Sequence, residues 1–118
     1  MTETETCELA RAYIALSNAH RAELISPMFA ADAVYHSSVV GEFHGVDAIA
    51  DMMRSFFARY ADAFWLCEHF RCQANRVIFD FSLQASDNQS GAQLQRSGIE
   101  RIEFDDQGLI KRLEVKSD

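Results

Sequence analysis

Side chains in the second half of the chain alternate between apolar and polar with a period of two, and this pattern limits the possible folds more than any other feature. In residues 77–85 every second residue is apolar, from Val77 to Ala85, and the residues between them are mostly polar. Such alternation is typical of a strand that buries one face. Similar patterns, separated by turn sequences, predict further strands at 64–72, 93–104 and 109–116.

Helical periodicity precedes these strands. Apolar residues recur at helical spacing over four turns of residues 46–60, and Asp47 in the first turn favours the positive end of the helix dipole. A first helix is expected from Cys7, with Leu9, Tyr13 and Leu16 on its apolar face. The sequence thus predicts two amphipathic helices in the first half of the chain.

The segments around these helices are expected to be short. Residues 1–6 are polar and mostly acidic, and we expect them to be disordered. A short helical stretch is expected at 24–29 and a strand at 33–38. Gly41 and Gly45 are expected to bracket a loop.

The order of the elements predicts an α+β domain, because helices come first and a four-stranded antiparallel meander follows. We expect a single domain over residues 1–118. Acidic residues outnumber basic ones by 18 to 11, and the net charge of −7 argues against nucleic acid or an anionic membrane as a partner. We find no secretory signal, and no apolar run approaches the ~20 residues that span a bilayer.

The cysteines and histidines show no arrangement typical of a metal or redox site. Cys7, Cys67 and Cys72 are an odd number at spacings that match no such motif, so we expect reduced thiols in a cytoplasmic protein. The histidines are not closely paired, and no glycine-rich sequence matches a phosphate-binding loop. We therefore expect no metal and no cofactor.

Motifs spread over nearly the whole length carry a resemblance to a known family. They are Tyr13 in the first helix, the stretch 29–35, Gly45 followed by Ala48-Ile49, and the closing hairpin 102–110. On these residues the chain resembles the SnoaL-like and ketosteroid isomerase-like branch of the nuclear transport factor 2-like superfamily. The resemblance implies a cone-shaped α+β fold, in which the N-terminal helices pack on a strongly curved, mainly antiparallel sheet that encloses an apolar pocket.

The same resemblance implies a homodimer formed through the outer face of the sheet. Alternation in the strand at 64–72 places Trp65, Cys67, His69 and Arg71 on one face, and we expect these four side chains at the interface. A scaffold that uses this outer face for a different protein is a further alternative.

Two positions match groups that steroid isomerases of this family use. Tyr13 matches the tyrosine that donates a hydrogen bond to the developing enolate; the alternative is a core aromatic whose hydroxyl binds a backbone carbonyl. Glu100 matches the second, protonated acid of the oxyanion site. Arg96 shares its strand face, and it either tunes or pairs with Glu100 or binds an acidic substrate group. Without a partner, burial would raise the pKa of Glu100 and make it a usable acid or base.

Ser37 falls at the position where the same isomerases carry the proton-shuttling carboxylate. A serine hydroxyl cannot shuttle a proton without a neighbouring base, so Ser37 argues against the family's usual route. His36 is the alternative base, although strand geometry points it to the opposite side. His44 is expected near the pocket rim.

For the pocket wall we expect further aromatic, aliphatic and polar side chains beside the catalytic candidates Tyr13 and Glu100. The expected ligand-binding residues are Phe29, Tyr35, Ser37, Phe56, Tyr60, Phe79, Phe81, Arg96 and Leu113.

Two functions fit these residues. The first is a cofactor-independent isomerase, cyclase or dehydratase that transfers a proton on a small apolar carbonyl compound, such as a polyketide, terpenoid or steroid fragment. In this function Tyr13 polarises the carbonyl and Glu100 moves the proton. The second is a non-catalytic dimeric module that binds a small hydrophobic molecule, in which Arg96 and Glu100 satisfy each other. Convergence of Tyr13 and Glu100 on one point of a cavity distinguishes the first from the second.

Overall fold

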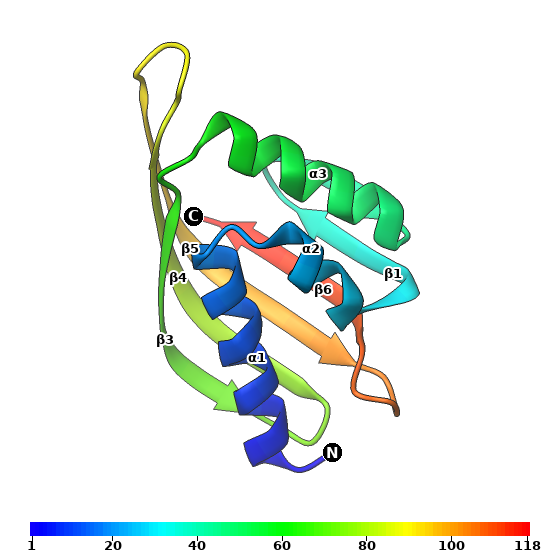
Figure 1. Cartoon of the computed structure of the whole chain (residues 1–118). Helices are drawn as coiled ribbons and strands as arrows, with labels where there is room; N and C mark the ends of the chain where they lie inside the picture. The colour runs from blue at the N-terminus through cyan, green and yellow to red at the C-terminus, as the bar shows by residue number, and fades with distance from the viewer.

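A six-stranded sheet forms the body of the protein, and both long helices lie on one face of it (Figure 1). The computed structural model describes all residues from 1 to 118. The strands follow the order β2-β1-β6-β5-β4-β3, and neighbours are antiparallel except for β1 and β6. Their bounds are β1 Phe29–Ser37, β2 Gly41–His44, β3 Phe64–Cys72, β4 Arg76–Ser86, β5 Gln93–Phe104 and β6 Ile110–Ser117.

The four strands expected in the second half are present as β3 to β6, and they form the predicted antiparallel meander. The sheet continues through β1, which begins at Phe29 and not at residue 33 as expected. The expected loop between Gly41 and Gly45 is instead strand β2, which forms a hairpin with β1. Ser37 closes the turn of this hairpin, because its hydroxyl oxygen accepts hydrogen bonds from two backbone N–H groups that follow it.

Helix α1 extends from Glu3 to Asn18, so it begins before the expected start at Cys7. Thr2 and Glu5 form a capping box, in which each side chain accepts a hydrogen bond from the backbone N–H of the other. Thr6 is fully buried, and its hydroxyl donates to the Ala74 carbonyl oxygen at 2.7 Å. The expectation of disorder at residues 1–6 is therefore wrong from Thr2 onward, because the cap and this contact fix the first turn.

The other helices connect α1 to the sheet and cover a second part of it (Figure 1). The short helix α2, Ala22–Ile25, and the 3-10 helix η1, Ser26–Met28, lie at the helical stretch expected at 24–29. Helix α3 runs from Val46 to Arg59, close to the predicted bounds. It follows Gly45, whose φ of 89° is in the region that favours glycine.

A β-bulge exchanges the two faces of β3 part-way along the strand. The register with β4 shifts between Glu68 and Arg71, and His69 has a left-handed φ of 57° there. Beyond the bulge Phe70 turns to the helix side of the sheet, where its ring stacks on Phe79 with the ring centroids 5.0 Å apart. One extra residue therefore reverses the alternation that the sequence shows.

Because of this bulge, the four residues expected at a dimer interface do not share a face. Trp65 and Cys67 lie on the inner side of the sheet, beneath the helices. His69 and Arg71 face outward, and both bind Asp80 on β4, at 2.8 and 3.4 Å. The predicted interface face is therefore wrong for Trp65 and Cys67.

A disulfide bond joins Cys7 in α1 to Cys72 at the end of β3. The expectation of three reduced thiols is therefore wrong for this pair, because the fold brings together residues that are 65 positions apart; Cys67 stays free. The cytoplasmic location that rested on reduced thiols stays a prediction. No helix of the structure is long and apolar enough to cross a membrane.

Two hydrophobic clusters fill the space between the helices and the sheet. The larger contains the most deeply buried large side chains, among them Phe79, Phe104, Ile25, Ile49, Ile102 and Ile110. The smaller consists of Ala63, Phe81, Leu83 and Ala85. Cys67 and Val115 contact both clusters, and both line the cavity that is described below.

Gly98 permits a close approach of β6 to β5 at a position between Arg96 and Glu100. A methyl group on Gly98 would clash with the Lys116 carbonyl oxygen and would lie 2.9 Å from the Cα atom of Ser117. Both obstacles are backbone atoms, so β6 would have to move to make room.

We predict that Gly98→Ala lowers the free energy of unfolding by about 1–3 kcal/mol, because the added methyl group displaces a paired strand. Urea denaturation followed by circular dichroism measures the change. Ser97→Ala is the matched control, since Ser97 is exposed on the opposite face of β5 and its loss is expected to have little effect. Equal stability of Gly98→Ala and the wild type would contradict the close approach.

Candidate active site

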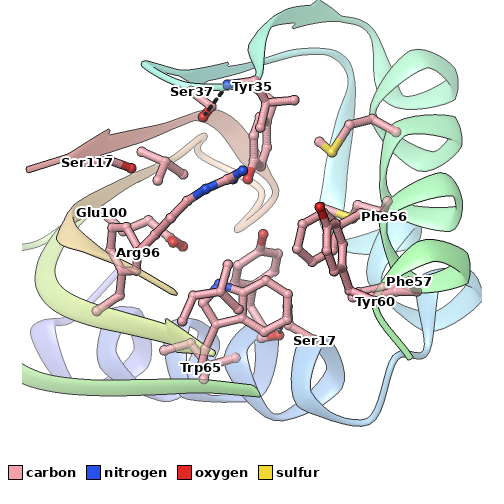
Figure 2. A pocket seen from close by; sticks show the side chains of 18 of the residues that line it. Ser17, Tyr35, Ser37, Phe56, Phe57, Tyr60, Trp65, Arg96, Glu100 and Ser117 are labelled. Atoms are coloured by element: carbon pink, nitrogen blue, oxygen red, sulfur yellow. Dashed lines mark hydrogen bonds between the residues drawn. The ribbon is translucent and has the colours of Figure 1, made fainter. Parts of the chain in front are cut away.

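A cavity of about 460 Å³ lies between α1, α3 and the inner face of the sheet (Figure 2). Its wall is mainly apolar, and its aromatic members are Phe43, Phe56, Phe57, Tyr60, Trp65 and Phe81, in addition to two tyrosines that are discussed below. Cavities of roughly 300–1,000 Å³ with a few convergent polar groups are typical of small-molecule sites. The cavity is therefore the candidate site.

Eight of the eleven residues expected in the site line this cavity. They are Tyr13, Tyr35, Ser37, Phe56, Tyr60, Phe81, Arg96 and Glu100. Phe29, Phe79 and Leu113 do not: they are 4%, 0% and 0% exposed and belong to the larger core cluster. Phe70 covers Phe79, and the ring of Tyr13 packs edge-on against Phe29 at 6.0 Å, so neither phenylalanine reaches the cavity.

The carboxyl group of Glu100 is the only acid that lines the cavity. Glu100 is 5% exposed, and its carboxyl group forms no ion pair and no hydrogen bond with another side chain. Its neighbours across the sheet are apolar, Phe79 on β4 and Val115 on β6. Burial alone raises the pKa of Glu100 to about 8, so the group is mostly protonated at neutral pH.

Two buried phenols share the cavity with Glu100. Burial raises the pKa of Tyr13 well above its usual value, and the charges of Tyr35 and Glu100 raise it further. Burial followed by the charge of Glu100 also raises the pKa of Tyr35. Tyr13, Tyr35 and Glu100 all line this cavity, and the effect of each charge on the pKa of its neighbours agrees with their shared position. No hydrogen bond joins the Tyr13 hydroxyl to a backbone carbonyl, which was the contact expected for the alternative role as a core aromatic.

An ion pair between Arg96 and Glu100, which is one of the alternatives that the sequence leaves open, does not form. Its side chain extends toward Tyr35 (Figure 2), and its charge opposes the rise in the pKa of Tyr35. The charge of Arg96 has no such effect on Glu100. Arg59, the other cationic residue of the wall, binds the Asp87 carboxylate at 2.8 Å. Arg96 is thus the cavity's unpaired cation.

Ser37 has a structural task at the cavity wall. Its hydroxyl oxygen accepts hydrogen bonds from the N–H groups of Val39 and Val40 at 3.2 and 3.1 Å, so only its own hydrogen is left to donate. His36 and His44 lie outside the cavity. Both contact Glu42, at 3.5 and 3.0 Å. Neither histidine is therefore placed to act as a base for Ser37 or for a bound ligand.

Sequence reasoning missed Trp65 and Cys67, which line the cavity because the bulge in β3 lies beyond them. Asn18 at the end of α1 holds Trp65 by hydrogen bonds to its backbone N–H and C=O, at 2.7 and 3.0 Å. Burial raises the pKa of the Cys67 thiol to about 12, which keeps it protonated and a poor nucleophile. Sequence reasoning also missed the hydroxyl groups of Ser17 and Ser117, which are part of the cavity wall.

We predict that the buried carboxyl group of Glu100 makes stability depend on pH. Its pKa rises from 4.5 in the unfolded chain to about 8, so between these values the folded protein keeps a proton that the unfolded chain releases. The contribution is fully present below about pH 4.5 and is lost as the pH rises through about 8, with a slope of roughly 1.4 kcal/mol per pH unit. In Glu100→Gln the slope disappears, so this variant gains stability relative to the wild type as the pH increases.

Urea denaturation at a series of pH values between these limits measures the difference between the two proteins. Glu103→Gln is the matched control, because Glu103 is on the same strand but pairs with Lys111 at 3.2 Å on the other face. A difference between wild type and Glu100→Gln that does not change with pH would show that Glu100 is ionised or exposed.

Comparison with known proteins supports the fold and the family. The family model described as a SnoaL-like domain matches residues 10–113. A search of curated protein sequences gives no match. Among solved structures, a proposed isomerase from Bacillus subtilis has a TM-score of 0.85 at 20% identity, covering 100% of this chain and 90% of that one. An LEH-like epoxide hydrolase from M. tuberculosis also has a TM-score of 0.85, at 16% identity, covering 98% and 84%.

AclR, a proposed hydroxylase from Streptomyces galilaeus, has a TM-score of 0.81 at 16% identity, covering 96% of this chain and 88% of that one. Identities this low establish a shared fold and leave the reaction open. The expected cone-like α+β arrangement of helices on a curved, mainly antiparallel sheet is confirmed, although the sheet is open and contains one parallel pair. Since the family model spans most of its length, the chain belongs to the SnoaL-like domain family.

Proposed function

We propose that the protein binds a small, largely apolar carbonyl compound and moves a proton on it without a cofactor. The observation that carries this proposal is the Glu100 carboxyl group, which is buried without a counter-charge in an apolar cavity that Tyr13 also lines. A group with a pKa of about 8 gives up and takes back a proton near neutral pH, which general acid–base catalysis requires.

The proposed reaction uses the neutral hydroxyl of Tyr13 and the two protonation states of Glu100. The ionised form of Glu100 removes a proton from the carbon next to the carbonyl, and the electron pair of the broken C–H bond moves into an enolate. The hydroxyl of Tyr13 donates a hydrogen bond to the enolate oxygen, where the negative charge collects. Where a carbon–carbon double bond extends the enolate to a dienolate, the carboxylic acid that has formed returns its proton to the far carbon of the dienolate, the double bond moves into conjugation with the carbonyl, and an isomer is released; in a simple ketone the proton returns to the same carbon.

A non-catalytic binding module is the second candidate. The observation that favours it is the position of Ser37, whose hydroxyl oxygen is already occupied by the turn of the β1–β2 hairpin. Ser37 therefore supplies no second base, and all proton transfer depends on Glu100. In a binding module the cavity would hold the ligand and leave its protons unchanged.

We predict that the wild type exchanges hydrogen for deuterium at the carbon next to the carbonyl of apolar ketones in D₂O, with a rate that rises with pH and levels off above about pH 8. Glu100→Gln lowers the rate by about 10²-fold or more, because the proton acceptor is lost. Tyr13→Phe lowers it by about tenfold or more, because the enolate loses a hydrogen-bond donor. Proton NMR of a panel of aryl alkyl ketones and cyclic enones measures the exchange.

Glu103→Gln again serves as the control, since it removes a carboxylate from the same strand but outside the cavity. Binding of the ketones without exchange by the wild type would favour the binding module. Exchange that survives in Glu100→Gln would remove this residue from the mechanism.

We also propose that two copies of the chain pair through the outer face of the sheet. Phe64 and Leu66 on β3 are 54% and 60% exposed, and Ile99 on β5 is 39% exposed. All three point away from the helices, and apolar side chains gathered on an open sheet face are typical of an interface. These residues replace the four that the alternation of β3 had predicted.

We predict a homodimer in sedimentation velocity experiments, and a monomer after Leu66→Glu, because a buried unpaired charge at the interface is unfavourable. Leu24→Glu is the control: Leu24 is 44% exposed but lies on α2, away from this face. A wild type that sediments as a monomer, or a Leu66→Glu variant that stays dimeric, would contradict the proposed interface.

A further inference from the structure

The cavity contains a cation that no protein group neutralises. Arg96 lies on the inner face of β5 and is partly buried in the cavity wall. Its guanidinium group forms no ion pair and no hydrogen bond, whereas Arg59 in the same wall is held by Asp87. Desolvating a guanidinium group without a partner is unfavourable, so the position of Arg96 calls for an anion.

No acid of the cavity can provide that anion. Glu100 is the only acidic residue in the wall, and Arg96, whose side chain reaches toward Tyr35 (Figure 2), forms no ion pair with it. Because Glu100 is mostly protonated at neutral pH, the cavity as a whole carries a positive charge. A charge that the protein leaves uncompensated is available to a ligand.

The groups around Arg96 are hydrogen-bond donors. Ser37 has only its hydroxyl hydrogen left to offer, because its oxygen accepts two backbone N–H groups. Tyr35 is a neutral phenol, since its pKa is raised, and Ser117 adds a hydroxyl from β6. Figure 2 shows Ser37 and Tyr35 on the side of the cavity toward which Arg96 extends. Donors around a guanidinium group form a site that suits a carboxylate, which only accepts hydrogen bonds.

We infer that the ligand carries a carboxylate, and that Arg96 binds it with help from the hydroxyls of Ser37 and Tyr35. The proposed function adds a carbonyl group near Tyr13 and Glu100. If it holds, the ligand is an apolar oxo acid, and this statement about the carbonyl group rests on the proposed function. Arg96 and Glu100 are four residues apart on the inner face of β5 and both line the cavity, so one ligand can contact both side chains.

A carboxylate fits this site better than a phosphate group. Arg96 is one guanidinium group, which matches the two oxygens of a carboxylate through paired N–H donors. A phosphate dianion has a larger charge, and neither a second unpaired cation nor a helix N-terminus lies beside Arg96 to balance it.

The test compares ligands that differ only in the charged group. A series of oxo acids with a terminal phenyl ketone and chains of increasing length is titrated into the protein, together with their methyl esters and the matching phosphonates. Isothermal titration calorimetry gives the affinities, and Trp65 in the cavity wall reports binding by fluorescence. We expect at least one acid to bind about tenfold or more tightly than its ester, and the phosphonates to bind no better than the acids.

Variants separate the role of Arg96 from a general effect of charge. In Arg96→Met the preference for the acid over the ester is lost, while the affinity for the ester is unchanged. In Arg96→Lys part of the preference is kept, because the charge remains but the paired donors are lost. Arg101→Met is the matched control, since Arg101 lies on the same strand but is exposed on the outer face. Equal affinity of the wild type for acids and esters, or an unchanged preference in Arg96→Met, overturns the inference.

A titration with benzoate tests the anion site even if no chain length fits. We expect the Nε–H resonance of Arg96 to shift in ¹H–¹⁵N spectra, and benzyl alcohol to cause no such shift; the absence of a benzoate shift overturns the inference. Glu100→Gln distinguishes this inference from the proposed function. It abolishes deuterium exchange but keeps the preference for acids, so a protein that prefers acids without exchanging protons disproves only the proposed reaction.

Discussion

Burial of the Glu100 carboxyl group without a counter-charge is the constraint on which the chemistry of this cavity depends. Only desolvation keeps the group protonated at neutral pH, and the sheet supplies it through Phe79 and Val115 on the neighbouring strands. An ion pair with Arg96 would cancel the effect and would use up the cavity's free cation. Because the two side chains form no ion pair, one group is able to exchange a proton and the other is able to hold an anion.

The sequence predicts which residues face inward better than it predicts which of them a ligand can reach. Alternation in β5 correctly places Arg96 and Glu100 on the buried face. The same pattern cannot distinguish a cavity wall from a core, because both consist of inward-facing apolar residues. Phe79 and Phe81 are two residues apart on β4, yet Phe70 covers the first and only the second reaches the cavity. The difference depends on a contact from another strand.

The sequence does not predict the bulge in β3 or the disulfide bond between α1 and β3. The bulge at Glu68–Arg71 adds one residue to β3 and reverses its faces, so Trp65 and Cys67 were assigned to the wrong side. At the bulge His69 adopts a left-handed backbone conformation that favours glycine or asparagine. Because a histidine occupies this position, the sequence gives no sign of the bulge. The Cys7–Cys72 disulfide likewise follows from the packing of α1 on the end of β3, which spacing along the chain does not reveal.

The family and the fold leave the reaction open, because similar structures include a proposed isomerase, a proposed hydroxylase and an epoxide hydrolase. The number of ionisable groups in the cavity restricts the possible reactions more than the family and the fold do. With Glu100 as the only acid and Ser37 committed to a turn, no separate base and acid are available. A reaction in which the same group removes a proton from one carbon and then returns it to another carbon needs only one ionisable group. An anchored carboxylate at Arg96 would keep both carbons within reach of Glu100 between the two steps.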